Sequence, residues 1–290
     1  MTLITEESNP VSVNLDLMGT EEILKIINDE DKKVPLAVEK AIPYIAQAVE
    51  IIVTNIKKGG RVKYFGCGTS GRIGMLDASE WESTFSAGDL VEAFIGSNDD
   101  NYDEGYKTAL QNVKENDVAI GLTASGQTLY VIGALEAAKL KGSKTISIIS
   151  NPIESAQKLV SLSDIVISVI TGPEIIRGST RMKAGTAQKL VLNMISTAVM
   201  VKLGRVYGNM MIMVKPLNNK LRERAIRIIR EITGVDDNVA RHAYEISNDV
   251  RLASLIALGI QDISTAYKIL EKNDWNLRKS IQEVLKRITI

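Results

Sequence analysis

Between residues 61 and 170 the chain alternates short, β-branched apolar runs with segments of helical periodicity, and this alternation restricts the fold more than any other feature. The runs are RVKYFG, LVEAFIG, DVAIGLT, KTISIIS and DIVISVI. Each is about the length of one strand, and most are almost continuously apolar, as parallel strands covered on both faces are. The sequence therefore predicts an α/β fold with a doubly wound, five-stranded parallel sheet. Ligands of such a sheet bind beyond the carboxyl ends of its strands.

Residues 1–20 look like an extended arm, helical segments lie between this arm and the alternation, and helical segments resume after Pro216. The C-terminal ones are LRERAIRIIREITG, DDNVARHAYEIS, VRLASLIALG, ISTAYKILEKN and WNLRKSIQEVLKRI. Consecutive amphipathic helices of this kind predict a small bundle that packs on the sheet domain or on a partner. We therefore expect three parts: an N-terminal arm and helix over residues 1–45, the sheet domain over residues 46–215 and a helical domain over residues 216–290.

Charge and cysteine content narrow the class of protein. Lys plus Arg and Asp plus Glu both number 35, which argues against a surface for nucleic acid or an anionic membrane. Cys67 is the only cysteine, so an intrachain disulfide and a cysteine zinc site are excluded. The N-terminus has no apolar core of signal-peptide length, and the longest apolar stretch, residues 190–201, is too short to span a bilayer. We expect a cytoplasmic protein.

The first predicted strand runs directly into a glycine-rich loop, GCGTSGR, at residues 66–72. Glycines let the backbone turn sharply near a ligand, and the free N–H groups of a helix start favour an anion. The GxGxxG spacing also permits a dinucleotide site. However, Gly96-Ser97 stands where that site needs an acidic residue, and the nearest acid is Asp99.

A similar loop follows the third predicted strand, because DVAIGLT runs into ASGQT at residues 124–128. Two hydroxyl-rich turns after neighbouring strands favour one phosphate held from two sides. Simple helix capping by the same hydroxyls is the alternative. The single histidine, His242, lies in a predicted amphipathic helix, where a structural role is the expected one. Acid–base chemistry would then depend on carboxylates.

The two loops resemble the sugar isomerase (SIS) domain. Longer stretches resemble the N-acetylmuramic acid 6-phosphate etherase family over nearly the whole chain. These are TEESNP at residues 5–10, ED at 30–31, YFGCGTSGRIGMLDASE at 64–80, TGPEIIRGSTRMKAGTAQKLVLNMIST at 171–197 and LRKSI at 277–281. The regulatory protein of mammalian glucokinase, which binds fructose phosphates without catalysis, is similar to the same family.

The resemblance implies a carbon–oxygen lyase that acts on a phosphorylated amino sugar without metal or cofactor. It removes the D-lactyl ether from C3 by elimination, and water then adds. Glu80, in DASE, matches the family's proton donor, and this role requires shielding from water so that a proton is available near neutrality. The expected substrate-binding residues of the loops are Gly68, Thr69, Ser70, Ser125, Gln127 and Thr128.

The GSTRMKAG block supplies the remaining expected binding residues. Ser179 and Thr180 look like hydroxyls that cap a helix starting near Lys183, and all three are predicted to contact substrate. Lys183 and Arg181 would hold a carboxylate or phosphate by charge-assisted hydrogen bonds. Alternatively, Glu174 is a salt-bridge partner of these cations.

The chain departs from the family's pattern after DASE. Trp81-Glu82-Ser83 replaces a Cys-Pro-Pro run, and the segment that holds the family's second catalytic glutamate is shortened. Asp99 and Asp100 are the nearest candidates for the missing base. Three outcomes stay open: one of these aspartates takes the role, elimination proceeds with a weaker base, or the site binds a sugar phosphate without turnover.

The rival functions are a non-catalytic sugar-phosphate sensor and an aldose–ketose isomerase. The isomerase shares the phosphate loops but leaves the GSTRMKAG block unexplained. Because SIS-type domains commonly complete each other's sites, and because the long N-terminal helix is unusually apolar, we also expect a homodimer.

Overall fold

The computed structural model describes residues 3–213 and 219–288. The chain forms two compact units. One, the sheet unit, contains Met1–Glu80 and Gly88–Thr197, and the other, the helical unit, contains Trp81–Ala87 and Ala198–Ile290. Compactness thus groups the chain into two units, and the three-part division expected from the sequence remains a prediction.

The sheet unit is built on a five-stranded sheet with the order β2-β1-β3-β4-β5. All neighbouring strands are parallel, which confirms the predicted fold. The strands are β1 (Val62–Cys67), β2 (Val91–Gly96), β3 (Val118–Leu122), β4 (Lys144–Ile149) and β5 (Ile165–Ser168). Gly66 of β1 lies opposite Leu122 of β3. The loops that follow these two strands therefore leave the sheet side by side, at the point where the strand order reverses.

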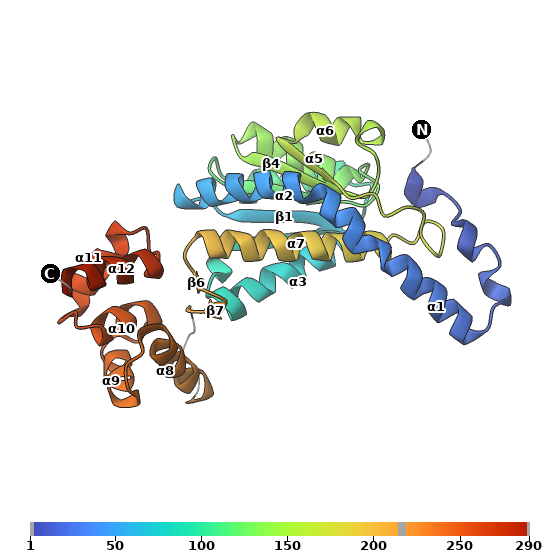
Figure 1. The fold of residues 1–290 in the computed structure, drawn as a ribbon. Coiled ribbons are helices and arrows are strands. Elements are labelled where there is room, and N and C mark those ends of the chain that lie inside the picture. Colours follow the sequence, from blue (N-terminus) through green and yellow to red (C-terminus); the bar gives the residue numbers. More distant parts are fainter. Residues whose placement is uncertain (1–2, 214–218, 289–290) are drawn as a thin grey trace. The chain divides into compact units, whose positions relative to one another are not determined.

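Helices cover both faces of the sheet (Figure 1). The helices that begin in this unit are α1 (Thr20–Asp31), α2 (Lys33–Lys57), α3 (Gly68–Phe85), α4 (Tyr102–Asn112), α5 (Leu129–Leu140), α6 (Gln157–Leu162) and α7 (Lys183–Lys202). Its short 3₁₀ turns are η1 (Ile4–Glu6), η2 (Pro10–Ser12), η3 (Leu15–Leu17), η4 (Gly88–Leu90) and η5 (Ile153–Ser155). Within residues 3–213 and 219–288, no helix has the length and apolar character needed to cross a bilayer.

Neighbouring side chains of β1 pack on opposite faces, as the strand period requires. Phe65 belongs to a buried cluster with Val131 and Leu135 of α5. Tyr64 faces the other way, and its hydroxyl donates to the buried Asp77 of α3 at 3.0 Å. The sheet is therefore covered on both faces, which explains the continuous apolar character of its central strands.

The N-terminal arm is tied to the sheet unit by polar side chains. Asn9 Nδ2 donates to the backbone oxygen of Pro173 at 3.0 Å, and Ser12 Oγ donates to that of Ile175 at 2.8 Å. Thr5 and Asn151 exchange two hydrogen bonds. The arm is thus held against the residues that follow β4 and β5.

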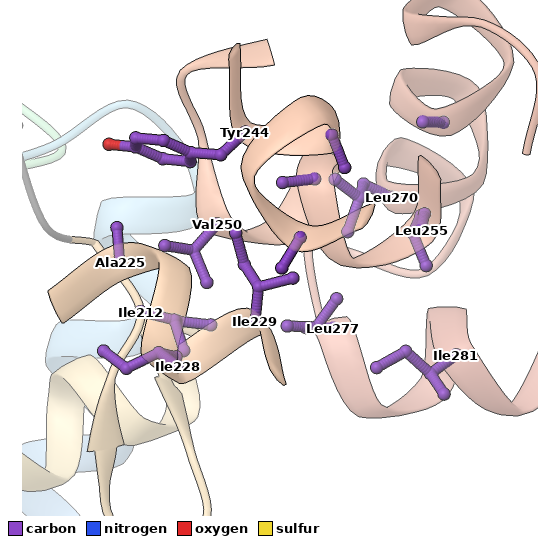
Figure 2. Packing of buried hydrophobic residues seen from close by; sticks show 14 of the residues in the cluster. Ile212, Ala225, Ile228, Ile229, Tyr244, Val250, Leu255, Leu270, Leu277 and Ile281 are labelled. Carbon is purple, nitrogen blue, oxygen red and sulfur yellow. The ribbon is translucent and has the colours of Figure 1, made fainter. Parts of the chain in front are cut away.

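The helical unit has its own core (Figure 2), formed by one apolar face of each helix and by Ile212. Its elements are β6 (Val206–Tyr207), β7 (Met210–Met211), α8 (Asn219–Thr233), α9 (Asp237–Ser247), α10 (Val250–Ala257), α11 (Ile263–Lys272) and α12 (Leu277–Ile288). Asp236, Asp249 and Asp262 cap α9, α10 and α11 by accepting backbone N–H groups. Each such cap stabilises a helix by ~1 kcal/mol. The predicted succession of C-terminal helices is confirmed.

Candidate functional site

A polar cavity of about 280 Å³ lies beyond the carboxyl ends of β1 and β3. Its walls come from five parts of the sheet unit: the loop after β1, the loop after β3, Asp99 after β2, the N-terminal arm and the segment before α7. The lining residues are Thr5, Glu6, Cys67, Gly68, Thr69, Ser70, Asp99, Leu122, Thr123, Ala124, Ser125, Thr128, Gly178 and Thr180.

The first loop brings the start of α3 to the cavity. α3 begins at Gly68, whose φ of +51° lies in the left-handed region that suits glycine. A Cβ on Gly71 would stand 2.6 Å from the backbone oxygen of Gly66, so only glycine lets the helix approach the strand end this closely. Thr69 and Ser70 occupy the first turn, where backbone N–H groups have no partner within the helix and favour an anion.

The second loop carries a cluster of hydroxyl groups. Thr123 Oγ1 lies 2.8 Å from Thr128 Oγ1 and 3.3 Å from Ser125 Oγ. Ser125 Oγ also accepts the backbone N–H of Gln127 at 3.1 Å. These contacts fix three hydroxyls at one end of the cavity, where they can donate to an anionic oxygen.

The two loops therefore converge as the sequence predicts, since Ser70 and Ser125 line one cavity. Among the described residues, no Lys or Arg side chain lines this cavity. A phosphate in this cavity would be held by hydroxyls and by backbone N–H groups at the start of α3, as anions at helix starts commonly are.

Gln127 and Ser179 do not line this cavity. The Gln127 side chain turns away and donates from Nε2 to the backbone oxygen of Ser155 at 3.1 Å. It lines a second cavity, of about 400 Å³, together with Tyr102 and Leu129. In the segment before α7, Thr180 faces the first cavity and the neighbouring Ser179 does not.

Lys183 lies away from the cavity that it was expected to line. Its side chain is 1% exposed, and its Nζ pairs with Glu30 Oε2 at 2.5 Å. Glu30 is itself 3% exposed and also accepts a hydrogen bond from Asn9. A buried ammonium requires a charged partner, and this one joins α7 to α1. The predicted substrate contact of Lys183 is thus replaced by a structural ion pair.

The cap of α7 also differs from the predicted one. The buried Glu174 accepts the backbone N–H groups of Lys183 and Ala184 at 3.0 and 2.9 Å. Among the described residues, the side-chain hydroxyls of Ser179 and Thr180 accept no backbone N–H group of α7. Burial raises the pKa of Glu174 and outweighs these two hydrogen bonds, which lower it. A carboxylate at the first turn suits the positive end of the helix dipole.

Glu80 is exposed rather than shielded. It lies in the later part of α3, its side chain is 55% exposed, and it pairs with Lys189 at 3.3 Å. It is not among the residues that line the cavity. The prediction that Glu80 is shielded from water, as an acid catalyst requires, is therefore wrong for a single chain.

The two candidate aspartates, Asp99 and Asp100, differ in their position relative to the cavity. Asp99 lines the cavity and Asp100 does not. Asp99 lies beside Cys67, and burial, together with the hydrogen bond to Asp99, raises the pKa of the Cys67 thiol to about 12. The thiol is thus protonated at neutral pH and is a weak nucleophile.

Several lining residues were not expected from the sequence, notably Thr5, Glu6, Thr123 and Gly178. Thr5 and Glu6 belong to TEESNP, which carries part of the family resemblance, so a signal for them existed. Because Thr5 and Glu6 are far from the strands along the chain, the sequence does not indicate that they reach the same cavity.

Residues 34–150, which contain β1, β3 and both loops of this cavity, match a family model described as the SIS domain. An N-acetylmuramic acid 6-phosphate etherase from Caldanaerobacter subterraneus subsp. tengcongensis is 47% identical to the chain, covering 97% of it and 95% of the relative. The relative of the same name from Actinobacillus pleuropneumoniae serotype 7 is 46% identical, covering 96% and 95%. The chain belongs to the N-acetylmuramic acid 6-phosphate etherase family.

Solved structures share the fold of about two thirds of the chain. A protein from Escherichia coli CFT073 aligns with a TM-score of 0.50 at 22% identity, covering 66% of this chain and 97% of that one. A protein from Listeria monocytogenes described as a candidate sugar-phosphate isomerase aligns with a TM-score of 0.51 at 18% identity, covering 64% and 93%. At these identities the likeness concerns the fold alone.

Proposed function

We propose that the protein cleaves the D-lactyl ether of N-acetylmuramic acid 6-phosphate, giving N-acetylglucosamine 6-phosphate and D-lactate. One observation carries the proposal: the two hydroxyl-bearing loops line a single cavity in a chain that is 46% and 47% identical to etherases over nearly its whole length. The activity is that of a carbon–oxygen lyase.

The reaction consists of an elimination and an addition of water. A base removes the C2 proton, which is acidic because the open-chain sugar has an aldehyde at C1. The C2–C3 double bond forms as the C3–O bond breaks, and an acid protonates the departing lactate oxygen. Water then adds its hydroxyl at C3, and C2 regains a proton. A well-placed acid or base contributes roughly 10²–10⁴-fold to such steps.

The residues around the cavity suit these roles unequally. The hydroxyls of Ser70, Ser125 and Thr128, with Thr69 and Thr180 beside them, would bind the phosphate end. Asp99 is our candidate for the C2 base, because it alone of the two predicted aspartates lines the cavity. Glu80 keeps the acid role that its place in DASE implies.

An exposed Glu80 fits this role if a second protomer shields it. Leu24 of α1 and Leu36 of α2 are also exposed, and apolar side chains on such helices suit a contact between copies. We therefore propose a homodimer in which each protomer supplies Glu80 to a completed site. A cytoplasmic location is part of the same proposal.

The test is direct. Purified protein is incubated with N-acetylmuramic acid 6-phosphate, and D-lactate is measured with a coupled dehydrogenase assay. D-lactate should form in proportion to N-acetylglucosamine 6-phosphate. If neither product appears while the protein is folded, the proposal is wrong.

Glu80→Gln and Asp99→Asn should each lower kcat for D-lactate release by about 10²-fold or more, because each removes one proton-transfer group. Asp100→Asn is the matched control and should retain nearly full activity, since Asp100 does not line the cavity. Initial rates over a range of substrate concentrations separate kcat from KM. An Asp99→Asn protein with wild-type kcat would remove Asp99 from the mechanism.

A non-catalytic sugar-phosphate sensor is the second candidate. The surface position of Glu80 and the turn of Gln127 away from the cavity favour it. Such a sensor would show a thermal shift with N-acetylglucosamine 6-phosphate but release no D-lactate, which separates it from the lyase.

A further inference from the structure

The N-terminal arm forms one wall of the polar cavity. Thr5 is 1% exposed, and its backbone N–H and hydroxyl both bond to the side chain of Asn151. Asn151 Nδ2 also donates to the backbone oxygen of Ala124, in the second hydroxyl-bearing loop, at 2.9 Å. The arm is therefore connected through one buried amide to the loop that carries Ser125.

The segment before α7 holds the arm from the other side. The backbone N–H of Gly178 donates to the backbone oxygen of Thr5 at 3.1 Å. Arg177 Nε donates to the backbone oxygen of Glu6 at 2.6 Å. These contacts fix the backbone of residues 5 and 6. Glu6 itself lines the cavity.

The Glu6 carboxylate has no hydrogen bond or ion pair to another side chain among the residues that the structure describes. It lies against Gly178, since a Cβ built there would stand 3.1 Å from Glu6 Oε2. Gly178 has a φ of +75°, which glycine adopts without strain. The absence of a side chain at this position gives the carboxylate the space that it occupies.

The negative charge of the Glu6 carboxylate determines which part of a bound ligand can lie next to it. A phosphate dianion is repelled by a carboxylate and attracted by hydroxyls and by the N–H groups at a helix start. The phosphate end therefore belongs at the loops, and Glu6 faces the sugar. An ionised carboxylate only accepts hydrogen bonds, so its partners are sugar hydroxyls or an amide N–H.

We infer that Glu6 is a specificity-determining residue, which accepts a hydrogen bond from a hydroxyl or from the amide N–H of the bound sugar phosphate. The inference rests on the proposed function for the identity of the sugar. In this role the arm is part of the binding site, and Thr5 is a positioning residue that holds Glu6 over the cavity.

The test compares two probes, N-acetylglucosamine 6-phosphate and inorganic phosphate, by isothermal titration calorimetry. Glu6→Ala should weaken binding of the sugar phosphate about tenfold or more, since a hydrogen bond to a charged group is lost. It should leave binding of inorganic phosphate unchanged or slightly tighter, because a repulsive charge is removed. Glu7→Ala changes the adjacent exposed glutamate, which does not line the cavity, and should bind both probes as the wild type does.

Two results would overturn the inference: Glu6→Ala binds the sugar phosphate as tightly as the wild type, or it weakens both probes equally. The second result would mean that Glu6 only shapes the arm. Failure of the proposed function has a different signature, because the wild type then releases no D-lactate from N-acetylmuramic acid 6-phosphate. The ratio of the two affinities in Glu6→Ala is measured without turnover and is independent of that assay.

Discussion

Lys183→Met should lower the free energy of unfolding by about 3–5 kcal/mol, the usual cost of leaving a buried charge without its partner. Lys183 and Glu30 are 1% and 3% exposed, and they pair at 2.5 Å. The substitution leaves the Glu30 carboxylate in an interior site without this ammonium. The first transition in thermal unfolding should fall by roughly 10 °C.

Lys33 provides a matched control, because its ammonium pairs with the same carboxylate but its side chain is 59% exposed. Lys33→Met should cost less than about 1 kcal/mol, as exposed ion pairs do. Equal, small effects for the two variants would contradict a structural role for the buried pair.

The pH dependence of the same pair has a defined sign. Burial raises the pKa of Glu30, but the hydrogen bonds from Lys183, Lys33 and Asn9 together outweigh it and hold the pKa below its ordinary value of 4.5. A carboxyl group of this kind stabilises the fold fully above its unfolded pKa and loses that contribution as pH falls through the folded value. The stability difference between wild type and Lys183→Met should therefore shrink below about pH 4.

The double variant Ser70→Ala/Ser125→Ala should lower kcat/KM for D-lactate release by about 10²–10⁴-fold. Each hydroxyl would donate to the phosphate dianion, and a hydrogen bond to a charged group contributes ~1.5–3 kcal/mol. Affinity for inorganic phosphate should fall in parallel, because both serines act at the phosphate end.

Ser161→Ala is the control for this pair. Ser161 is exposed on α6, where its hydroxyl donates to the backbone oxygen of Lys158. It should retain wild-type kinetics. A double variant that binds inorganic phosphate as well as Ser161→Ala does would show that the loops have another role.

The sheet and the convergence of its loops could be predicted because both depend on local pattern. Buried parallel strands are recognisable as continuous apolar runs. Once β1 and β3 are neighbours in register, the loops after them must meet at one edge of the sheet. Ser70 and Ser125 therefore share a cavity for reasons that the sequence already contains.

The positions of Lys183, Glu80 and Glu6 depend on contacts that no local pattern specifies. GSTRMKAG does not indicate that Lys183 meets Glu30, a residue 153 positions away. DASE places Glu80 on α3 but does not say which side of that helix is covered. TEESNP gives no sign that the arm is held by Asn151. In each case the partner is distant in sequence and is supplied by tertiary packing.

A crystal structure of the protein with N-acetylglucosamine 6-phosphate tests the central claim most directly. We expect the phosphate between the two loops, with its oxygens within hydrogen-bond distance of the Ser70 and Ser125 hydroxyls and the sugar directed toward Glu6. A phosphate bound elsewhere, for example in the cavity beside Tyr102 and Gln127, would contradict the account.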